Sequence, residues 1–183
     1  MTKKAQILAI SGSTRSNSSN HRLIKAIARL SEDDMEIRLY EGIAVLPHFD
    51  PDITDDNLPQ PVTDFKRQLR EADGVIICTP EYAHGVPGSL KNALDWTVSS
   101  GEFSHKPTIL VTASTDGRYG HNALLETLRV IEAENIDNLN LLVQFVRTKV
   151  SGDNTITDEK TLTHLQQLLA IFRQTLAKDK IDR

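Results

Sequence analysis

The residues best suited to chemistry lie in a short, hydroxyl-rich loop near the start of the chain. The stretch from Ser11 to Asn20 has one glycine (Gly12), one arginine (Arg15) and eight hydroxyl or amide side chains: Ser11, Ser13, Thr14, Ser16, Asn17, Ser18, Ser19 and Asn20. The loop follows an apolar run and precedes apolar residues at helical spacing, which predicts a strand, a tight loop and a helix start. Hydroxyl groups, a guanidinium and the free N–H groups of a helix N-terminus are donors that suit phosphate.

A simpler interpretation is that one of these residues caps the helix, as serine and asparagine often do. One cap needs one such residue, whereas this loop supplies many and an arginine, so we favour phosphate binding. The loop lacks both the Gly-Lys-Ser/Thr run of nucleoside triphosphatases and the three glycines of a dinucleotide fingerprint. Hydroxyl donors in place of glycines suit a terminal monophosphate that is wrapped from all sides, which points to a mononucleotide such as FMN.

The elements that would position this loop alternate between strands and helices. Apolar runs predict five strands, at residues 6–10, 35–40, 74–79, 108–113 and 139–146. Helical spacing predicts five helices, at residues 19–30, 61–71, 90–96, 124–131 and 158–178. The alternation predicts a single α/β domain over residues 1–183, with three layers and a doubly wound, parallel five-stranded sheet in the order 2-1-3-4-5.

Three unusual loops should meet at one edge of that sheet. Ligands of doubly wound sheets bind beyond the carboxyl ends of the strands, where the chain switches direction between strands one and three. The loops that gather there are residues 11–20, 80–88 and 114–120. We therefore expect one shared site.

Composition excludes several other classes of protein. The 183 residues carry a formal charge of −4, which gives no reason to expect a nucleic-acid partner. The apolar runs are too short to span a bilayer, so we expect no membrane partner and a cytoplasmic location. The one cysteine, Cys78, excludes an internal disulfide and reads as a small buried hydrophobe. The six histidines show no metal-ligand spacing, so no metal site is expected.

Two motifs carry a family resemblance. Gly12, Ser13, Arg15, Ser18 and Asn20 match every fixed position of G-S-x-R-x-x-S-x-N, and residues 80–96 match P-E-Y-N-x-x-x-P-G-x-L-K-N-A-L/I-D-W except at the asparagine. Together they resemble the NADPH-dependent FMN reductases of flavodoxin-like fold, which include quinone, chromate and azo reductases. The departure is Ala83, which removes a side chain near the expected edge of the flavin.

The resemblance implies three groups of cofactor-binding residues. The FMN phosphate would be held by Ser13, Arg15, Ser18, Ser19 and Asn20. The isoalloxazine ring would be lined, largely through backbone groups, by Pro80, Glu81, Tyr82, Ala83 and His84. The other side of the ring would be closed by the segment from Ser114 to Arg118, with Ser114, Asp116, Gly117 and Arg118.

The chemistry implied by the resemblance belongs to the cofactors. NADPH (or NADH) would pass a hydride to FMN, and a small-molecule electron acceptor would then take the electrons: a quinone, an azo dye, chromate or free flavin. Backbone N–H groups near the ring would stabilise its negative charge after reduction. No side-chain acid or nucleophile is required, so we name no catalytic residue.

Several residues keep two interpretations at this stage. Glu81 could be a general base, but its proline and tyrosine neighbours favour a role in shaping the loop. Arg118 could neutralise charge on the reduced flavin or be a solvated loop arginine. The segment Leu46–Asp50 could be a subunit contact, a pocket rim or a plain surface loop. Lys91 and Asp95, four residues apart on a helix, can pair, and we interpret their helix face as structural or interfacial.

The quaternary structure and the class of activity also have alternatives. The resemblance implies a homo-oligomer, a dimer or a dimer of dimers. One alternative function is a flavodoxin-type electron carrier, although flavodoxins tend to be strongly acidic and lack the loop arginine. A second is a flavin-free binding domain, against which the intact phosphate and ring motifs argue.

Overall fold

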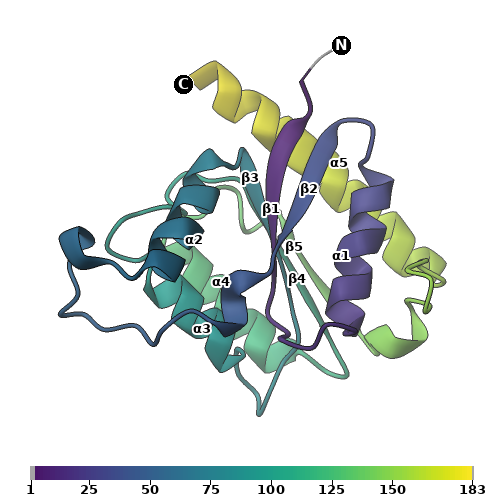
Figure 1. Ribbon diagram of the computed structural model, residues 1–183. Coiled ribbons are helices and arrows are strands. Elements are labelled where there is room, and N and C mark those ends of the chain that lie inside the picture. The colour runs from purple at the N-terminus through teal and green to yellow at the C-terminus, as the bar shows by residue number, and fades with distance from the viewer. Residues whose placement is uncertain (1–2, 183) are drawn as a thin grey trace.

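A parallel sheet of five strands forms the centre of the protein, and its order is β2-β1-β3-β4-β5, which confirms the predicted topology (Figure 1). The computed structural model describes residues 3–182, apart from the side chains of residues 179–182. The strands are β1 (Ala5–Ser11), β2 (Met35–Tyr40), β3 (Gly74–Thr79), β4 (Thr108–Ser114) and β5 (Asn140–Gln144). All four strand pairs are parallel, so the carboxyl ends of the strands meet at one edge of the sheet.

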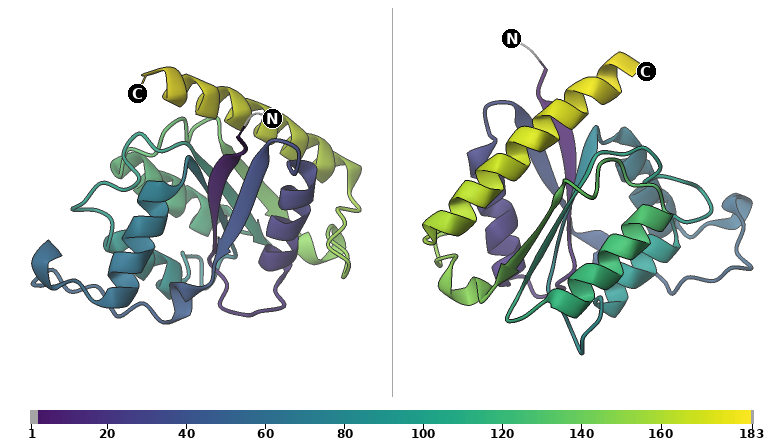
Figure 2. Two further views of the ribbon diagram at one scale, coloured as in Figure 1. Left: turned by 45° about the horizontal axis from the view of Figure 1, so that its top comes forward. Right: turned by 180° about the vertical axis from the view of Figure 1, so that it is seen from behind.

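Five helices cover the two faces of the sheet. They are α1 (Ser19–Leu30), α2 (Gln60–Glu71), α3 (Gly88–Asp95), α4 (Arg118–Val130) and α5 (Glu159–Asp182), with short 3₁₀ turns at Gly42–Ala44 (η1), Asp55–Asn57 (η2) and Val146–Thr148 (η3). Helices α1 and α5 lie on one face and α2, α3 and α4 on the other, as the opposite views show (Figure 2). None of the described helices is long and apolar enough to cross a membrane.

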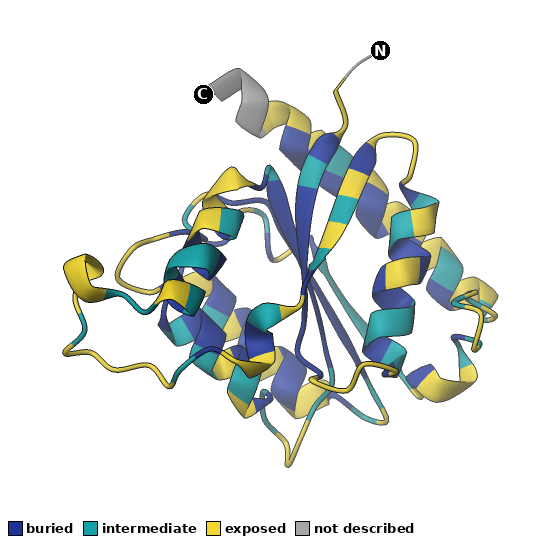
Figure 3. Ribbon diagram, viewed as in Figure 1, coloured by how far each residue is buried: buried dark blue, intermediate teal, exposed yellow. Residues whose placement is uncertain are grey.

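Burial explains why the middle strands are mostly apolar. Every residue of β3 is buried, and β1 and β4 are nearly so, because helices cover both of their faces (Figure 3). The edge strand β2 instead mixes buried, half-buried and exposed residues. The apolar residues form two clusters, one on each face, with Phe65 and Trp96 in the first and Leu23 and Phe172 in the second.

Two elements differ from the sequence prediction at the edge where ligands should bind. Helix α4 begins at Arg118, not at residue 124, because Gly117 is left-handed and precedes its first turn. The predicted loop at 114–120 is therefore shorter, and Arg118 belongs to a helix. Strand β5 ends at Gln144, not at residue 146, because Phe145 also has a left-handed backbone and turns the chain away from the sheet.

The long connection after β2 is anchored on helix α3. The carbonyl oxygen of Pro47 accepts hydrogen bonds from Nδ2 of Asn92 and from Nε1 of Trp96, both at 2.9 Å. The backbone N–H of Phe49 donates to Oδ1 of Asn92 at 2.7 Å. Leu46 is buried in the core, so at this residue the segment 46–50 is not a plain surface loop. Asn92 and Trp96 thus have a structural role.

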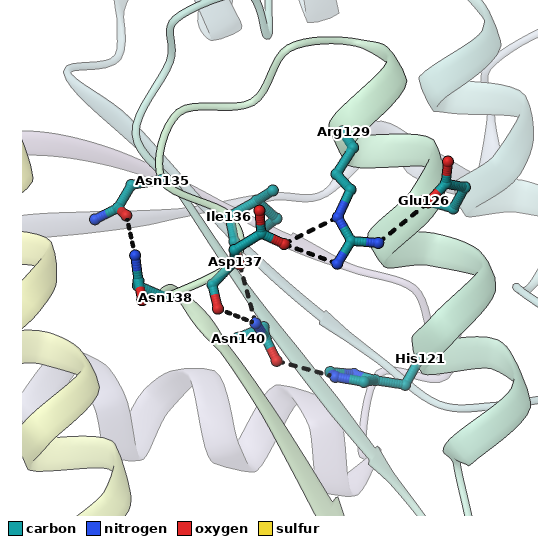
Figure 4. A network of polar contacts seen from close by, with 8 residues as sticks. All are labelled: His121, Glu126, Arg129, Asn135, Ile136, Asp137, Asn138 and Asn140. Atoms are coloured by element: carbon teal, nitrogen blue, oxygen red, sulfur yellow. Dashed lines mark hydrogen bonds and ion pairs between the residues drawn. The ribbon is translucent and has the colours of Figure 1, made fainter.

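A buried histidine joins α4 to the last two strands (Figure 4). Nε2 of His121 lies 3.2 Å from Oδ1 of Asn140, and Nδ1 lies 2.9 Å from the hydroxyl of Thr112. The amide of Asn140 is fixed in turn, because its Nδ2 donates to the carbonyl oxygens of Ile136 and Asp137. Burial lowers the pKa of His121, so the folded protein holds the ring neutral.

The free energy of unfolding should therefore fall as the pH drops below about 6.5, the ordinary pKa of histidine. The unfolded chain takes up a proton on this ring more readily than the folded chain, so acid favours unfolding. Urea unfolding between pH 8 and pH 5 measures the effect. His121→Gln should flatten the slope, whereas His164→Gln, at an exposed position on α5, should leave it unchanged. Equal slopes for His121→Gln and the wild type would contradict the assignment.

Candidate functional site

A cavity of about 590 Å³ lies at the carboxyl edge of the sheet, in the range of sites for small molecules. Four segments line it. They are the loop and first turn of α1 (Ser13, Arg15, Asn17, Ser18, Ser19, Asn20, Arg22), the end of β3 (Pro80, Glu81, Tyr82), the end of β4 (Ala113, Ser114, Thr115) and the segment after β5 (Phe145, Val146, Arg147, Thr148).

The hydroxyl-rich loop passes so close to β3 that only glycine fits at its start. The backbone N–H of Gly12 donates to the carbonyl oxygen of Cys78 at 2.9 Å. A Cβ atom on Gly12 would lie 2.1 Å from Oγ1 of Thr79. The hydroxyl of Ser11 then fixes the turn, because it donates to the carbonyl oxygen of Ser13 and accepts from the N–H of Ser13.

Three serine hydroxyls of this loop keep a proton to donate. Ser18 caps α1, with its Oγ accepting the N–H of His21 at 3.1 Å. Oγ of Ser13 accepts the N–H of Arg15 at 3.4 Å. In the described part of the chain, no hydrogen bond is donated by the hydroxyls of Ser13, Ser18 or Ser19. These donors and the N-terminus of α1 fit a phosphate group.

Asn20 joins the start of α1 to the sheet. Its Oδ1 accepts from the thiol of Cys78 at 3.2 Å, and its Nδ2 donates to the carbonyl oxygen of Ala113 at 3.3 Å. Cys78 is fully buried, as the sequence predicted, and burial raises the pKa of its thiol, so the sulfur keeps its proton and can donate. Asn20 therefore fixes where the hydroxyl-rich loop lies relative to the ends of β3 and β4.

The loop after β3 contains a two-residue turn with an unusual sequence. Tyr82 and Gly85 exchange backbone hydrogen bonds at 3.1 and 2.9 Å, and the two central residues, Ala83 and His84, have φ values of 48° and 57°. Positive φ at both positions is the signature of a type I′ turn, which favours Asn-Gly. The family's usual asparagine at position 83 thus has a backbone explanation. The ring of His84 stacks on the ring of Tyr119, with 4.3 Å between the two ring centroids.

Glu81 locks this turn to helix α4. One carboxylate oxygen accepts the backbone N–H of Gly120 at 2.6 Å and so caps the first turn of the helix. A Cβ atom on Gly120 would lie 3.0 Å from the carbonyl oxygen of Gly85, so the two segments are in direct contact. The sequence allows Glu81 to be either a general base or a residue that shapes the loop. The hydrogen bond to Gly120 favours the role in shaping the loop.

Arg118 is paired rather than free. Its Nε lies 2.8 Å from Oδ1 of Asp116, and its Nη2 lies 3.0 Å from Oδ2. The guanidinium lowers the pKa of the Asp116 carboxyl, whose Oδ1 also accepts from Nε2 of Gln144. This exposed pair fixes the segment between β4 and α4.

The cavity unites most of the predicted site residues and adds others. The predicted residues that line it are Ser13, Arg15, Ser18, Ser19, Asn20, Pro80, Glu81, Tyr82 and Ser114. Five predicted residues are not among its lining: Ala83, His84, Asp116, Gly117 and Arg118. The lining also includes residues that are not among the predicted cofactor-binding set: Asn17 of the hydroxyl-rich loop, Arg22, Ala113, Thr115 and the segment Phe145–Thr148. That segment follows the carboxyl end of a parallel strand, which is the available signal, but an apolar run continuing to Val146 concealed the end of the strand.

The sheet order and the hydroxyl-rich loop at its switch point define a flavodoxin-like protein built to bind a mononucleotide. Residues 5–145 match the model of the NADPH-dependent FMN reductases, and the chain belongs to that family. This confirms the predicted family, its oxidoreductase class and its use of FMN and NAD(P)H.

Known relatives extend along nearly the whole chain. A quinone reductase of Escherichia coli is 30% identical over 99% of this chain and 100% of its own length. A 2-hydroxy-1,4-benzoquinone reductase of a Burkholderia species is 29% identical over 90% of this chain and 92% of its own. The solved structure of FerB, a flavoenzyme NAD(P)H:(acceptor) oxidoreductase from Paracoccus denitrificans, superposes with a TM-score of 0.79, at 26% identity, over 95% of this chain and 98% of the other.

Ala83→Asn should stabilise the protein by about 1 kcal/mol, because asparagine tolerates the left-handed backbone better than alanine does. Ala83 is exposed, so the substitution disturbs no packing. Ala83→Val is the matched comparison and should destabilise the protein, because a β-branched side chain is disfavoured at positive φ. Denaturant unfolding measures both changes. A wild type as stable as Ala83→Asn would show that the turn is not strained.

Proposed function

We propose that this protein is an NAD(P)H-dependent quinone reductase that holds FMN in the cavity at the carboxyl edge of its sheet. The observation that carries the proposal is that one cavity is lined by the donor hydroxyls, the N-terminus of α1, Arg15 and the segment Pro80–Tyr82. Two relatives whose names specify quinones support this acceptor class.

In this proposal the phosphate end of FMN lies against the hydroxyl-rich loop. Ser13, Ser18 and Ser19 donate their free hydroxyl protons to phosphate oxygens, and Arg15 supplies a guanidinium. Asn20 lines the same wall, but its amide is bound to Cys78 and Ala113, so we assign it the role of positioning the loop.

The ring end lies beside the turn after β3 and the start of α4, which contact each other through Gly85 and Gly120. When bound, FMN supplies an acceptor for hydride and a donor of electrons to the quinone. Among the described residues, no hydrogen bond uses the backbone N–H groups of Ala83 and His84. We propose that these donors face the polar edge of the ring, and that Glu81 holds the turn in place through Gly120. Ser114, Asp116, Gly117 and Arg118 form the opposite border.

Anaerobic visible spectroscopy tests the function directly. The purified protein should bind FMN, its flavin bands should bleach with NADPH or NADH, and a benzoquinone should restore them. Arg15→Ala should weaken FMN binding by about 1.5–3 kcal/mol, the range for a hydrogen bond to a charged group. Arg38→Ala is the control, since it removes an equal charge from an exposed position on β2.

Each contrary result has a distinct meaning. A protein that binds no flavin would be a binding domain that kept the fold. Flavin bands that persist with both nicotinamides would identify an electron carrier. Unchanged FMN affinity in Arg15→Ala would remove the phosphate assignment.

We further propose that the protein works as a homo-oligomer, with the connection after β2 in the interface. Val45 and Val98 keep 70% and 57% of their surfaces exposed, next to a loop that Asn92 and Trp96 hold rigid. Val45→Asp with Val98→Asp should reduce the mass measured by light scattering. Val130→Asp, which alters an equally exposed valine at the end of α4, should not. An unchanged mass in the double variant would remove this surface from the interface.

A single domain and a cytoplasmic location complete the proposal. The described helices all pack on one sheet, and the one cysteine is free and buried, as suits a reducing compartment. Cell fractionation and limited proteolysis test these two points, and a stable proteolytic fragment would contradict the single domain.

A further inference from the structure

The segment after β5 forms a wall of the cavity that the family motifs do not describe. Phe145, Val146, Arg147 and Thr148 all line the cavity, yet the family match ends at residue 145. The contribution of η3 is therefore derived from the structure.

The fold places this segment at the phosphate end of the cavity. The N–H of Phe145 donates to the carbonyl oxygen of Thr115, which starts the segment beside the end of β4. Val146 is buried in the cluster that also contains Leu23 and Ile24 of α1. In both Figure 1 and the right view of Figure 2, η3 lies beside the end of α1 that begins at Ser19. The ring-side helices α3 and α4 cover the opposite face.

The backbone of the segment is strained at Phe145, its first residue, which lines the cavity. Phe145 has φ 53° and ψ 38°, a left-handed conformation that a bulky aromatic residue rarely adopts. The N–H and the hydroxyl of Thr148 both donate to the carbonyl oxygen of Phe145, at 3.0 and 2.9 Å, and hold the turn. Such strain is concentrated at ligand sites, where the surrounding structure stabilises it.

The charges in the cavity call for an anion with more than one negative charge. Three arginines line the cavity, and Glu81, the one lining carboxylate, accepts the N–H of Gly120. Arg22 donates to Oδ1 of Asn17. Within the described residues, neither Arg15 nor Arg147 has a partner for its guanidinium. The chain as a whole is acidic, with a formal charge of −4, so this cationic cavity stands out from its surroundings.

We infer that Arg147 is a second guanidinium for the 5′-phosphate of FMN, approaching from η3 while Arg15 approaches from the loop after β1. A phosphate monoester carries nearly two negative charges at neutral pH and accepts several hydrogen bonds, which one arginine does not satisfy. Arg147 thereby makes the protein select FMN over riboflavin. The inference rests on the proposed FMN site and adds a residue to it.

Equilibrium titration of the flavin-free protein with FMN and with riboflavin tests the inference without measuring activity. Quenching of flavin fluorescence gives both dissociation constants. Arg147→Ala should raise the FMN constant about tenfold or more and leave the riboflavin constant within about twofold, because riboflavin lacks the phosphate. Arg147→Lys should retain part of the FMN affinity, and the control Arg38→Ala should change neither constant.

Other outcomes overturn the inference in different ways. An equal loss for both flavins would assign Arg147 to packing, and unchanged FMN binding would remove it from the site. Unchanged FMN binding together with weaker binding of NADPH but not NADH would assign it to the 2′-phosphate of the nicotinamide. Wild-type protein that binds neither flavin would end the proposed function itself, whereas loss of this inference alone requires a wild type that binds FMN.

Discussion

The close approach of Gly12 to the end of β3 is the constraint on which the site depends. With its N–H bonded to Cys78 and no space for a Cβ atom beside Thr79, the chain leaves β1 in one direction only. The serines that follow therefore lie at the switch point of the sheet, and Ser18 lies at the start of α1. Asn20 then closes the arrangement by bonding to both neighbouring strands. Two buried strands and one glycine thus determine where the hydroxyl-rich loop lies.

The ring side depends on a second contact of long range. Glu81 reaches α4 and replaces the side-chain cap that the helix lacks, so the turn after β3 is held against the start of α4. The turn itself is strained at Ala83 and His84, and stacking of His84 on Tyr119 supports it. Polar contacts fix the base of the turn, whereas its tip, Ala83 and His84, is exposed to solvent.

The sequence predicts the parts of this structure that local patterns encode. Apolar runs and helical spacing are enough for the sheet order, and the residues from Gly12 to Asn20 are enough to single out a loop that lines the cavity. The start of α4 could not be predicted, because its cap is a carboxylate 39 residues away in sequence. The same reason hides the bonding of Asn20, which involves residues of two other strands. The end of β5 could not be predicted either, because nothing in an apolar run marks Phe145 as a residue with a left-handed backbone.

The burial of Cys78 has a consequence for the proposed quinone chemistry. Quinones are electrophiles, and they alkylate cysteines that are accessible and deprotonated. This chain has one cysteine, it is fully covered by the sheet and α1, and its thiol keeps its proton as a donor to Asn20. The sulfur that helps to position the hydroxyl-rich loop is thus shielded from the proposed substrate. The same contact that orders the loop keeps the one thiol of the chain out of reach of an electrophile.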